Sequence, residues 1–252
     1  MRISQIRVFR ADLPMREGSY SWSTQSHTAF DTSIVLIDTD DGITGVGECC
    51  PLGPTYLPAY ADGVRAGIAQ LAPSLIGHDP TQLDHINAVM DTHLKGHPYV
   101  KSALDMACWD ILGKAANLPL YILLGGKLQD SVTLYKVVTR TDPAAMAERI
   151  PEYRDQGFRQ FQVKVGESPA TDIIRIHRVA QEMRAGEVLN ADANTGWKQH
   201  EALQVADAIA DLGRQTGIRV TFEQPCLSYH ECLAVRQHTN LPFVLDECMD
   251  SI

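Results

Sequence analysis

The sequence predicts an α/β protein in which a smaller α+β region precedes a parallel (β/α) barrel. From about residue 131 onward, short apolar strands alternate with helical stretches, which is the order of βαβ units in a parallel sheet. Each of these strands carries a polar residue near its C-terminal end, as in barrels whose functional groups lie there. No G-x-G-x-x-G sequence follows a strand, which disfavours a dinucleotide-binding sheet.

The composition is that of a globular chain with an acidic balance. The 252 residues include 22 Lys and Arg against 31 Asp and Glu, a formal charge of −9, and 44% of them are apolar. This apolar content excludes a disordered chain, and the missing basic surplus disfavours nucleic acid as a partner. No stretch approaches about eighteen consecutive apolar residues, and the N-terminus lacks the apolar block of a signal peptide. We therefore expect a cytoplasmic protein without a membrane partner.

The first third combines strands and helices without the βαβ alternation. Asp40-Asp41-Gly42 predicts a hairpin turn between two apolar runs. Asn117 is suited to end the longest helix in a left-handed conformation. We expect strands at 3–9, 33–38 and 43–48, and helices near 58–72, 81–93 and 99–116. We expect one face of the last helix to be formed by Ala103, Met106, Ala107, Ile111 and Gly113.

The later part of the chain repeats one strand and one helix. We expect strands at 132–138, 158–165, 188–194, 219–225 and 242–247. We expect the intervening helices at 142–156, 170–184, 198–213 and 229–238. An eight-unit barrel takes roughly 250 residues by itself, whereas the fifth strand here ends close to Ile252. We therefore expect the chain to be a C-terminally truncated fragment of a longer protein.

Period-two alternation assigns each strand residue to one face of the sheet. The apolar positions form the helix-facing set: Phe161, Val163, Val165, Leu189, Ala191, Ala193, Val220, Phe222, Phe243 and Leu245. The intervening positions face the barrel interior. Lys164, Asp192, Glu223 and Asp246 are therefore expected at the inward-facing C-terminal ends of four consecutive strands.

Three carboxylates that share a small site need a counter-charge, because like charges would otherwise force protonation. A divalent cation supplies this charge, and ligands made only of oxygen, without His or Cys, suit Mg²⁺. Asp192, Glu223 and Asp246 are therefore the candidate metal ligands. The alternative for any one of these acids is a helix cap or a surface ion pair.

Several linked motifs resemble the enolase superfamily, in particular its mandelate racemase/muconate lactonizing enzyme branch. The barrel motifs are Lys164-Val-Gly, Asp192-Ala-Asn194, Glu223-Gln224-Pro225 and Asp246-Glu247. The end of the first region carries Ala103-x-Asp105-x-Ala107-x-Trp109-Asp110-x-x-Gly113-Lys114, followed by Leu123-Leu124-Gly125-Gly126. The resemblance covers the whole chain.

The resemblance implies a capping domain over residues 1–126 and the first five strands of a modified (β/α)7β barrel over residues 127–252. It also implies Mg²⁺ ligation by Asp192, Glu223 and Asp246, with Glu247 supporting the ligands. The implied reaction is abstraction of the α-proton of a small carboxylate through an enediolate. Lys164 fits the role of the base that removes this proton, because a nearby cation disfavours the charged form of its amine.

Two departures from the branch narrow this expectation. The branch often shows Lys-x-Lys on the second barrel strand, whereas the first position here is Gln162. The Gln-x-Lys form resembles the members that act on proline derivatives. In the family a second lysine acts as a base from the opposite face of the substrate. That lysine lies on a later strand, beyond Ile252. The carboxamides of Gln162 and Asn194 are candidates to contact the substrate or the metal; packing in the barrel interior is the alternative.

Two loops of the capping region are expected to cover the barrel mouth, at about 14–30 and 49–57. Tyr20, Trp22 and Tyr56 in these loops are candidates to enclose a small ring or a quaternary ammonium group. Plain packing is the alternative for all three aromatic rings.

The overall pattern most resembles the members that dehydrate cis-3-hydroxy-L-proline. We therefore expect Mg²⁺-dependent α-proton abstraction followed by loss of water from a hydroxyproline-like carboxylate. One alternative is a racemase or epimerase of an amino acid or a proline betaine. Another is an inactive fragment that lacks the second base. The resemblance also implies a homo-oligomer for a full-length form.

Overall fold

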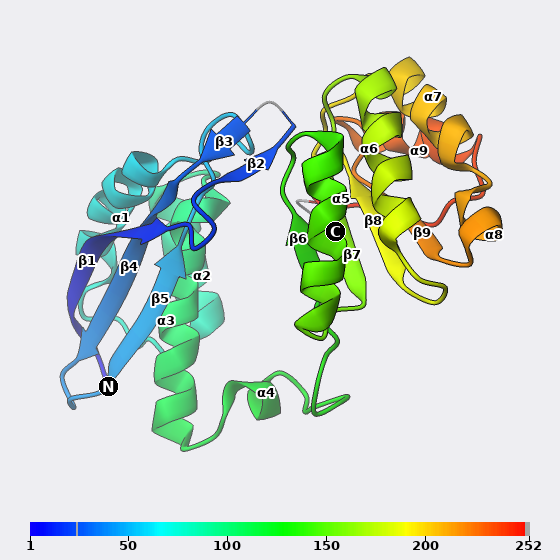
Figure 1. Ribbon diagram of the computed structural model, residues 1–252. Coiled ribbons are helices and arrows are strands. Elements are labelled where there is room, and N and C mark those ends of the chain that lie inside the picture. The colour runs from blue at the N-terminus through cyan, green and yellow to red at the C-terminus, as the bar shows by residue number, and fades with distance from the viewer. Residues whose placement is uncertain (24, 250–252) are drawn as a thin grey trace. The chain divides into compact units, whose positions relative to one another are not determined.

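The computed structural model describes residues 1–23 and 25–249, which fall into two compact units (Figure 1). Unit 1 consists of Met1–Pro14 and Ala29–Ser131, and unit 2 of Met15–Thr28 and Val132–Ile252. The segment 15–28 thus leaves the first sheet and joins the second unit. The boundaries 1–126 and 127–252 stay a prediction.

Unit 1 is a three-stranded antiparallel sheet with helices. The sheet has the order β1-β4-β5, and the predicted turn at 40–42 joins its last two strands. Its strands are β1 (Ile3–Pro14), β4 (Ala29–Thr39) and β5 (Thr44–Cys49). Its helices are α1 (Ala61–Leu75), α2 (Leu83–His93), α3 (Pro98–Ala116) and α4 (Leu120–Leu123). Asn117 ends α3 in the left-handed region, with φ 54° and ψ 40°, as predicted.

Strand β5 packs against α3 at backbone contact distance. A Cβ atom at Gly47 would lie 1.9 Å from the carbonyl oxygen of Ala103, and one at Gly45 would lie 2.1 Å from that of Ala107. Glycine is therefore required for this close approach. Met106 was expected to share one face of α3 with Ala103 and Ala107, but it is 43% exposed while those two residues are fully buried, because it lies on the side of Ala103 that faces away from Ala107.

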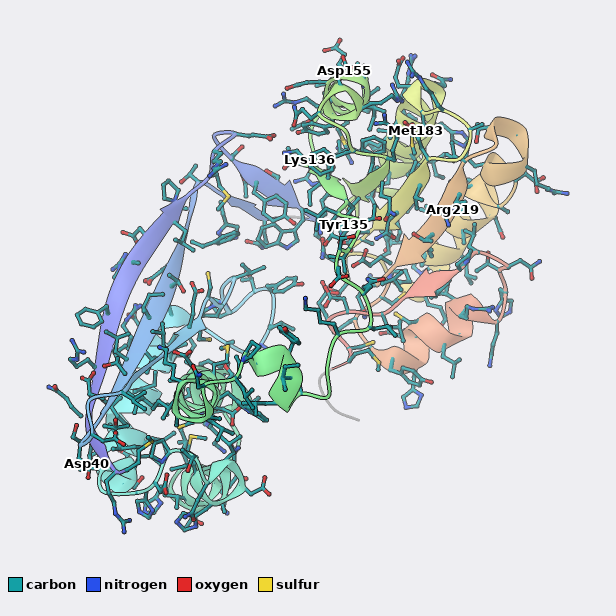
Figure 2. All side chains as sticks on the ribbon, turned by 90° about the horizontal axis from the view of Figure 1, so that it is seen from below. Asp40, Tyr135, Lys136, Asp155, Met183 and Arg219 are labelled. Carbon is teal, nitrogen blue, oxygen red and sulfur yellow. The ribbon has the colours of Figure 1, made fainter. Side chains whose placement is uncertain are left out.

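Unit 2 contains a five-stranded parallel sheet with the order β10-β9-β8-β7-β6. The strands are β6 (Lys136–Val138), β7 (Gln160–Lys164), β8 (Val188–Asp192), β9 (Arg219–Glu223) and β10 (Phe243–Val244). The helices are α5 (Pro143–Asp155), α6 (Pro169–Glu182), α7 (Gln199–Ile209), α8 (Leu212–Thr216) and α9 (Tyr229–Arg236). The strand–helix alternation predicted from the sequence is confirmed. In Figure 2, Asp155 and Met183 mark the ends of α5 and α6, and Arg219 marks the start of β9.

The first strand of this sheet is shorter than predicted. Val132 and Leu134 are 67% and 65% exposed, and only Lys136–Val138 pairs with β7. Both apolar side chains stay largely exposed to solvent in the described chain, so alternation alone did not make a strand there. Within residues 1–23 and 25–249 the sheet has five strands, and the closed (β/α)7β barrel stays a prediction.

The two faces of the sheet divide as the alternation predicts. The helix-facing residues Phe161, Ala191 and Phe222 are fully buried and pack with residues of α5, α6, α7 and α9 in one core. The opposite face carries the polar set, which includes Lys164 and Asp192. A separate core lies in unit 1.

A hairpin of β2 (Tyr20–Trp22) and β3 (Gln25–His27) completes unit 2. None of the helices in the described part of the chain is long and apolar enough to cross a membrane.

Candidate active site

The strand register brings three predicted site residues into one row. Lys164 pairs with Asp192, and Asp192 pairs with Glu223, as neighbouring positions of β7, β8 and β9. Val244 of β10 pairs with Glu223, which places Asp246 two residues beyond the end of the last described strand. Parallel pairing without a register shift is the reason that side chains far apart in sequence meet here.

Lys164 and Asp192 form a buried ion pair in which Lys164 Nζ donates to Asp192 Oδ2. The other carboxylate oxygen accepts a hydrogen bond from the backbone N–H of Asn194 at 2.9 Å. Burial raises the pKa of Asp192 even though Lys164 opposes the shift. Burial by itself would lower the pKa of Lys164, but the charge of Asp192 raises it to about 12. The amine is therefore held protonated by its partner.

Glu223 is only 7% exposed and is held by neutral donors rather than by a cation. Its Oε2 accepts from Gln162 Nε2 at 3.0 Å and from Asn190 Nδ2. Asn190 in turn accepts from the hydroxyl of Thr221 at 2.7 Å. Burial and the nearby charge of Asp192 raise the pKa of Glu223.

Asn190 is a site residue that the sequence reasoning did not single out. The signal was present, because the same alternation that selects Asp192 places Asn190 two positions earlier on the same face. The alternation does not show which residue Asn190 contacts. The contact with Glu223 depends on the side-by-side pairing of β8 and β9.

The residues after β10 differ in exposure. Asp246 is exposed, and its backbone N–H donates to Gln224 Oε1 at 2.8 Å. Glu247 is half-buried and accepts from Asn194 Nδ2 at 3.0 Å. Burial and the charges of Asp192 and Asp246 raise the pKa of Glu247 to about 7.

The oxygen ligands of this site suit a hard divalent cation, although the carboxylates form hydrogen bonds with protein groups in this structure. The charge of Asp192 raises the pKa of Glu223 and, together with that of Asp246, the pKa of Glu247, and a cation would relieve this repulsion. Two buried oxygens, Asn194 Oδ1 and Glu247 Oε2, have no hydrogen-bond partner among the residues that the structure describes. Among residues 1–23 and 25–249, however, no three His, Cys, Asp or Glu side chains stand close enough together to hold an ion. The chemistry of the set therefore fits Mg²⁺, while Lys164, Gln162 and Asn190 occupy the carboxylate oxygens.

The β2–β3 hairpin brings an aromatic ring to Lys164. Lys164 Nζ lies 5.8 Å from the centroid of the Tyr20 ring. Tyr20 in turn contacts Trp22, with ring centroids 4.9 Å apart, and Trp22 stacks on His27 at 4.8 Å. Trp22 is only 2% exposed. Tyr56 is half-buried in unit 1, between β5 and α1, and its role stays a prediction.

The hairpin is tied to the ends of β6 and β7 by its backbone. The N–H of Ser21 donates to Thr139 Oγ1 at 2.6 Å, and the N–H of Arg140 donates to the carbonyl of Ser21 at 2.9 Å. The N–H of Ser23 donates to the carbonyl of Val165 at 3.2 Å. These bonds explain why residues 15–28 belong to unit 2.

A cavity of about 330 Å³ opens between the hairpin and β6. Glu17, Tyr20 and Lys136 are among its lining residues. Glu17 accepts from Lys136 Nζ at 2.7 Å and from the hydroxyl of Tyr153 at 2.8 Å. Figure 2 shows Lys136 next to Tyr135 where the chain enters β6. The cavity is large enough for a small ring compound.

Two family models match the chain. Residues 5–125 match the mandelate racemase/muconate lactonizing enzyme N-terminal domain, and residues 145–252 match the enolase C-terminal domain-like family. A cis-3-hydroxy-L-proline dehydratase of Roseibium aggregatum is 50% identical over 251 residues, which cover 99% of this chain and 67% of the dehydratase.

Solved structures agree with this match. The N-succinyl Arg/Lys racemase of Bacillus cereus superposes with a TM-score of 0.93 at 30% identity, over 100% of this chain and 67% of that chain. A member of the enolase superfamily from Roseovarius nubinhibens, complexed with magnesium, superposes with a TM-score of 0.86 at 42% identity. That match covers 98% of this chain and 65% of the other. The chain thus spans about two thirds of the length of these relatives, and it belongs to the mandelate racemase/muconate lactonizing enzyme branch of the enolase superfamily.

Proposed function

We propose that the protein removes the α-proton of cis-3-hydroxy-L-proline and eliminates its β-hydroxyl as water. The observation that carries this proposal is the 50% identity, over 99% of the chain, to a dehydratase of that substrate. The row of Lys164, Asp192 and Glu223 at adjacent strand ends supports it, because it joins a base to a set of oxygen ligands.

Lys164 is the proposed base. Its amine is buried and ends in the same row as the carboxylates, within 5.8 Å of the Tyr20 ring. To act as a base, the amine must leave Asp192 and lose its proton. The α-carbon of the substrate then transfers its proton to Nζ. The electron pair of the broken Cα–H bond forms the Cα=Cβ double bond while the Cβ–O bond breaks, and the leaving hydroxyl group takes a proton from solvent and departs as water. Gln162 holds Glu223 beside this amine without adding a positive charge.

Asp192, Glu223 and Asp246 are the proposed ligands of Mg²⁺, with Glu247 held behind them by Asn194. When bound, the cation supplies positive charge beside the substrate carboxylate and beside Lys164, which stabilises the negative charge that develops and favours the neutral amine. Asp192 and Glu223 would present their carboxylates to this charge from buried positions, and Asp246 from an exposed one.

Tyr20 is the proposed substrate contact on the hairpin side. Its ring faces Lys164 and lines the cavity of about 330 Å³. The secondary ammonium group of a proline ring is a cation that an aromatic face attracts. Asn194 is the proposed polar contact, since its Oδ1 is buried and has no hydrogen-bond partner within residues 1–23 and 25–249. Trp22 supports Tyr20 by packing, and Tyr56 is proposed as a contact from the loop at 49–57.

Racemisation or epimerisation is the second candidate function, and the TM-score of 0.93 to a racemase favours it. Both reactions begin with the same α-proton transfer and differ only in whether a hydroxyl group then leaves or a proton returns. We also infer that residues 1–126 form the capping domain, that the five strands are part of a (β/α)7β barrel, and that a full-length form assembles as a homo-oligomer.

The test measures α-hydrogen exchange and water loss together. cis-3-Hydroxy-L-proline and Mg²⁺ are incubated in D₂O with this chain, and with the chain extended at its C-terminus by the last third of the Roseibium dehydratase. Water loss by either form supports the dehydratase. Deuterium incorporation without water loss contradicts dehydration and supports an epimerase.

The variant K164Q tests the role of Lys164 as the base separately from the other residues of the site. It is expected to abolish exchange and water loss, because no other amine stands at this place in the row. K101Q is the matched control, since Lys101 Nζ donates to Asp91 at 2.6 Å in unit 1 and takes no part in the row. Equal activity of K164Q and the unmodified chain would contradict the proposal.

A further inference from the structure

Asp172 is a fully buried carboxylate outside the row of site residues. It lies near the start of α6 and is 0% exposed. Its Oδ2 accepts hydrogen bonds from the backbone N–H of Gly166 at 3.1 Å, from that of Glu167 at 2.8 Å, and from the indole N–H of Trp197 at 3.1 Å. One oxygen therefore binds the loop after β7 and the loop after β8 at once.

Arg175 extends this anchor to a third loop. Its Nη1 donates to Asp172 Oδ1 at 2.7 Å, and its Nε donates to the carbonyl of Thr141 at 3.1 Å, in the loop after β6. Its Nη2 donates to Glu167 at 2.9 Å. The side chain is only 7% exposed. The pair thus joins the C-terminal ends of three consecutive strands through charge-assisted hydrogen bonds, which are the stronger kind.

The loops after β7 and β8 also touch through their backbones. A Cβ atom at Gly166 would lie 2.1 Å from the carbonyl oxygen of Ala193, and one at Gly196 would lie 2.1 Å from that of Gly166. Neither loop can therefore move without displacing the other. Gly166 follows Lys164 by two residues, and Ala193 follows Asp192 directly.

We propose that Asp172 is a positioning residue for the reaction. By fixing the loops after β7 and β8, it sets the place of Lys164 relative to Asp192 and Asn194 without touching the substrate. This inference rests on the proposed α-proton transfer. The physical reason is that proton transfer depends steeply on the distance and direction between base and α-carbon, whereas binding of a small substrate depends on them weakly.

The chain offers a matched control for the substitution of Asp172. Glu187 is also a buried carboxylate, 3% exposed, and it pairs with a buried arginine: Arg154 Nε and Nη2 donate to its oxygens at 2.7 and 2.9 Å. Its Oε2 also accepts from a backbone N–H, that of Arg184, at 2.8 Å. Glu187 precedes β8, so it lies at the end of the strand opposite to Asp192.

D172N and E187Q are compared by steady-state kinetics in the form that shows activity. D172N is expected to lower kcat by about 100-fold with little change in KM, as expected for a base displaced by about an ångström. E187Q is expected to leave kcat unchanged at a temperature where both variants are folded. Equal kcat values for D172N and E187Q would overturn the proposal, since Asp172 would then only stabilise the fold. R154K is a milder control should E187Q fail to fold.

Amide hydrogen exchange tests the anchor independently of activity. D172N is expected to speed exchange in peptides that cover 165–168 and 193–198, with the rest of unit 2 unchanged. Unchanged protection of these two loops would overturn the proposal even if kcat fell. A chain without α-hydrogen exchange would instead contradict the proposed function and the catalytic consequence of Asp172, while faster amide exchange in D172N would still support the anchor.

Discussion

The buried carboxylates of unit 2 differ in the partners that satisfy them. Glu187 and Asp172 are each paired with an arginine, whereas Glu223 is held by the neutral amides of Gln162 and Asn190. The pKa of Glu187 is therefore lowered, while that of Glu223 is raised. Glu187, Asp172 and Asp192 are thus each compensated by a cationic side chain, whereas the hydrogen bonds of Glu223 in the described chain come from neutral amides and leave its charge for a further cation to compensate.

Glu187 predicts how stability depends on pH. Burial by itself would raise its pKa, but hydrogen bonds from Arg154 and from the N–H of Arg184 lower it below the usual 4.5. A lowered pKa stabilises the fold above the unfolded-state pKa, and this contribution is lost as the pH falls through the folded-state pKa. Urea denaturation is expected to show a smaller loss of stability on acidification in E187Q than in the unmodified chain.

E187Q is also expected to lower the stability of the fold at neutral pH. Removing one partner of a buried ion pair leaves the Arg154 guanidinium uncompensated, which destabilises by about 3–5 kcal/mol. E187Q is therefore expected to lower the free energy of unfolding by that amount near pH 7. A change below about 0.5 kcal/mol, typical of surface substitutions, would show that the pair contributes little.

The proposed role of Asp192 as a ligand leads to a prediction of how Mg²⁺ changes the thermal stability of the chain. A cation that binds only the folded chain stabilises it by about 2.7 kcal/mol at a concentration one hundred times Kd. Thermal denaturation is expected to show a rise in Tm with Mg²⁺ that is lost in D192N. D142N is the control, because Asp142 caps α5 by accepting from the N–H of Ala144 and lies outside the row. An equal rise in D192N would contradict ligation by Asp192.

At the scale of elements, glycines decide how closely two backbones approach. Gly45 and Gly47 let β5 lie against α3, and Gly166 and Gly196 let the loops after β7 and β8 touch. The first contact builds the core of unit 1, and the second links the strand ends that carry the candidate base and its partner. The absence of a side chain at these glycines thus allows close packing in unit 1 and places the strand ends next to each other in unit 2.

G47A is expected to separate β5 from α3. The added Cβ would lie 1.9 Å from a backbone oxygen, and a helix backbone cannot yield as a flexible side chain does. Overpacking of this kind costs about 1–3 kcal/mol and occasionally more. V46T is the matched control, because Val46 lies on the same strand and is 47% exposed. Chemical denaturation that gave the same stability for both variants would show that β5 moves away freely.

At the scale of the whole molecule, each unit has its own core, and the chain passes from unit 1 to unit 2 for the last time near an irregular segment. Residues 125–135 have no helix or strand and are exposed throughout, and Leu128 is fully exposed. Such segments are the preferred sites of proteolytic cleavage, because few contacts must break for the chain to enter a protease.

Limited proteolysis is expected to cut first in this segment. Trypsin cleaves after Lys127, which lies inside 125–135 and precedes the fully exposed Leu128. The two products would begin at Met1 and at Leu128, as mass spectrometry of the fragments would show. K127Q is expected to protect the connection while other sites are cut slowly. A first cut within either core would contradict this division of the chain.

Much of the architecture could be predicted because the signals are local. Period-two alternation in β7, β8 and β9 separates Phe161 and Phe222 from Lys164 and Glu223, and backbone geometry alone enforces it. The order of strands and helices in unit 2 follows from the same patterns. The motifs at 164–166, 192–194 and 223–225 identify the family for the same reason.

Only the tertiary structure decided which residues meet across the chain. The hairpin at 15–28 joins unit 2 because its backbone bonds to Thr139, Arg140 and Val165, more than a hundred residues later. The exposure of Val132 and the position of Met106 depend on what surrounds a strand or a helix, which no local pattern records. The anchor at Asp172 and the contact of Asn190 with Glu223 likewise depend on how neighbouring strands and loops pair. Sequence patterns fix the face on which a side chain lies, whereas its partner is set by packing between segments distant in the chain.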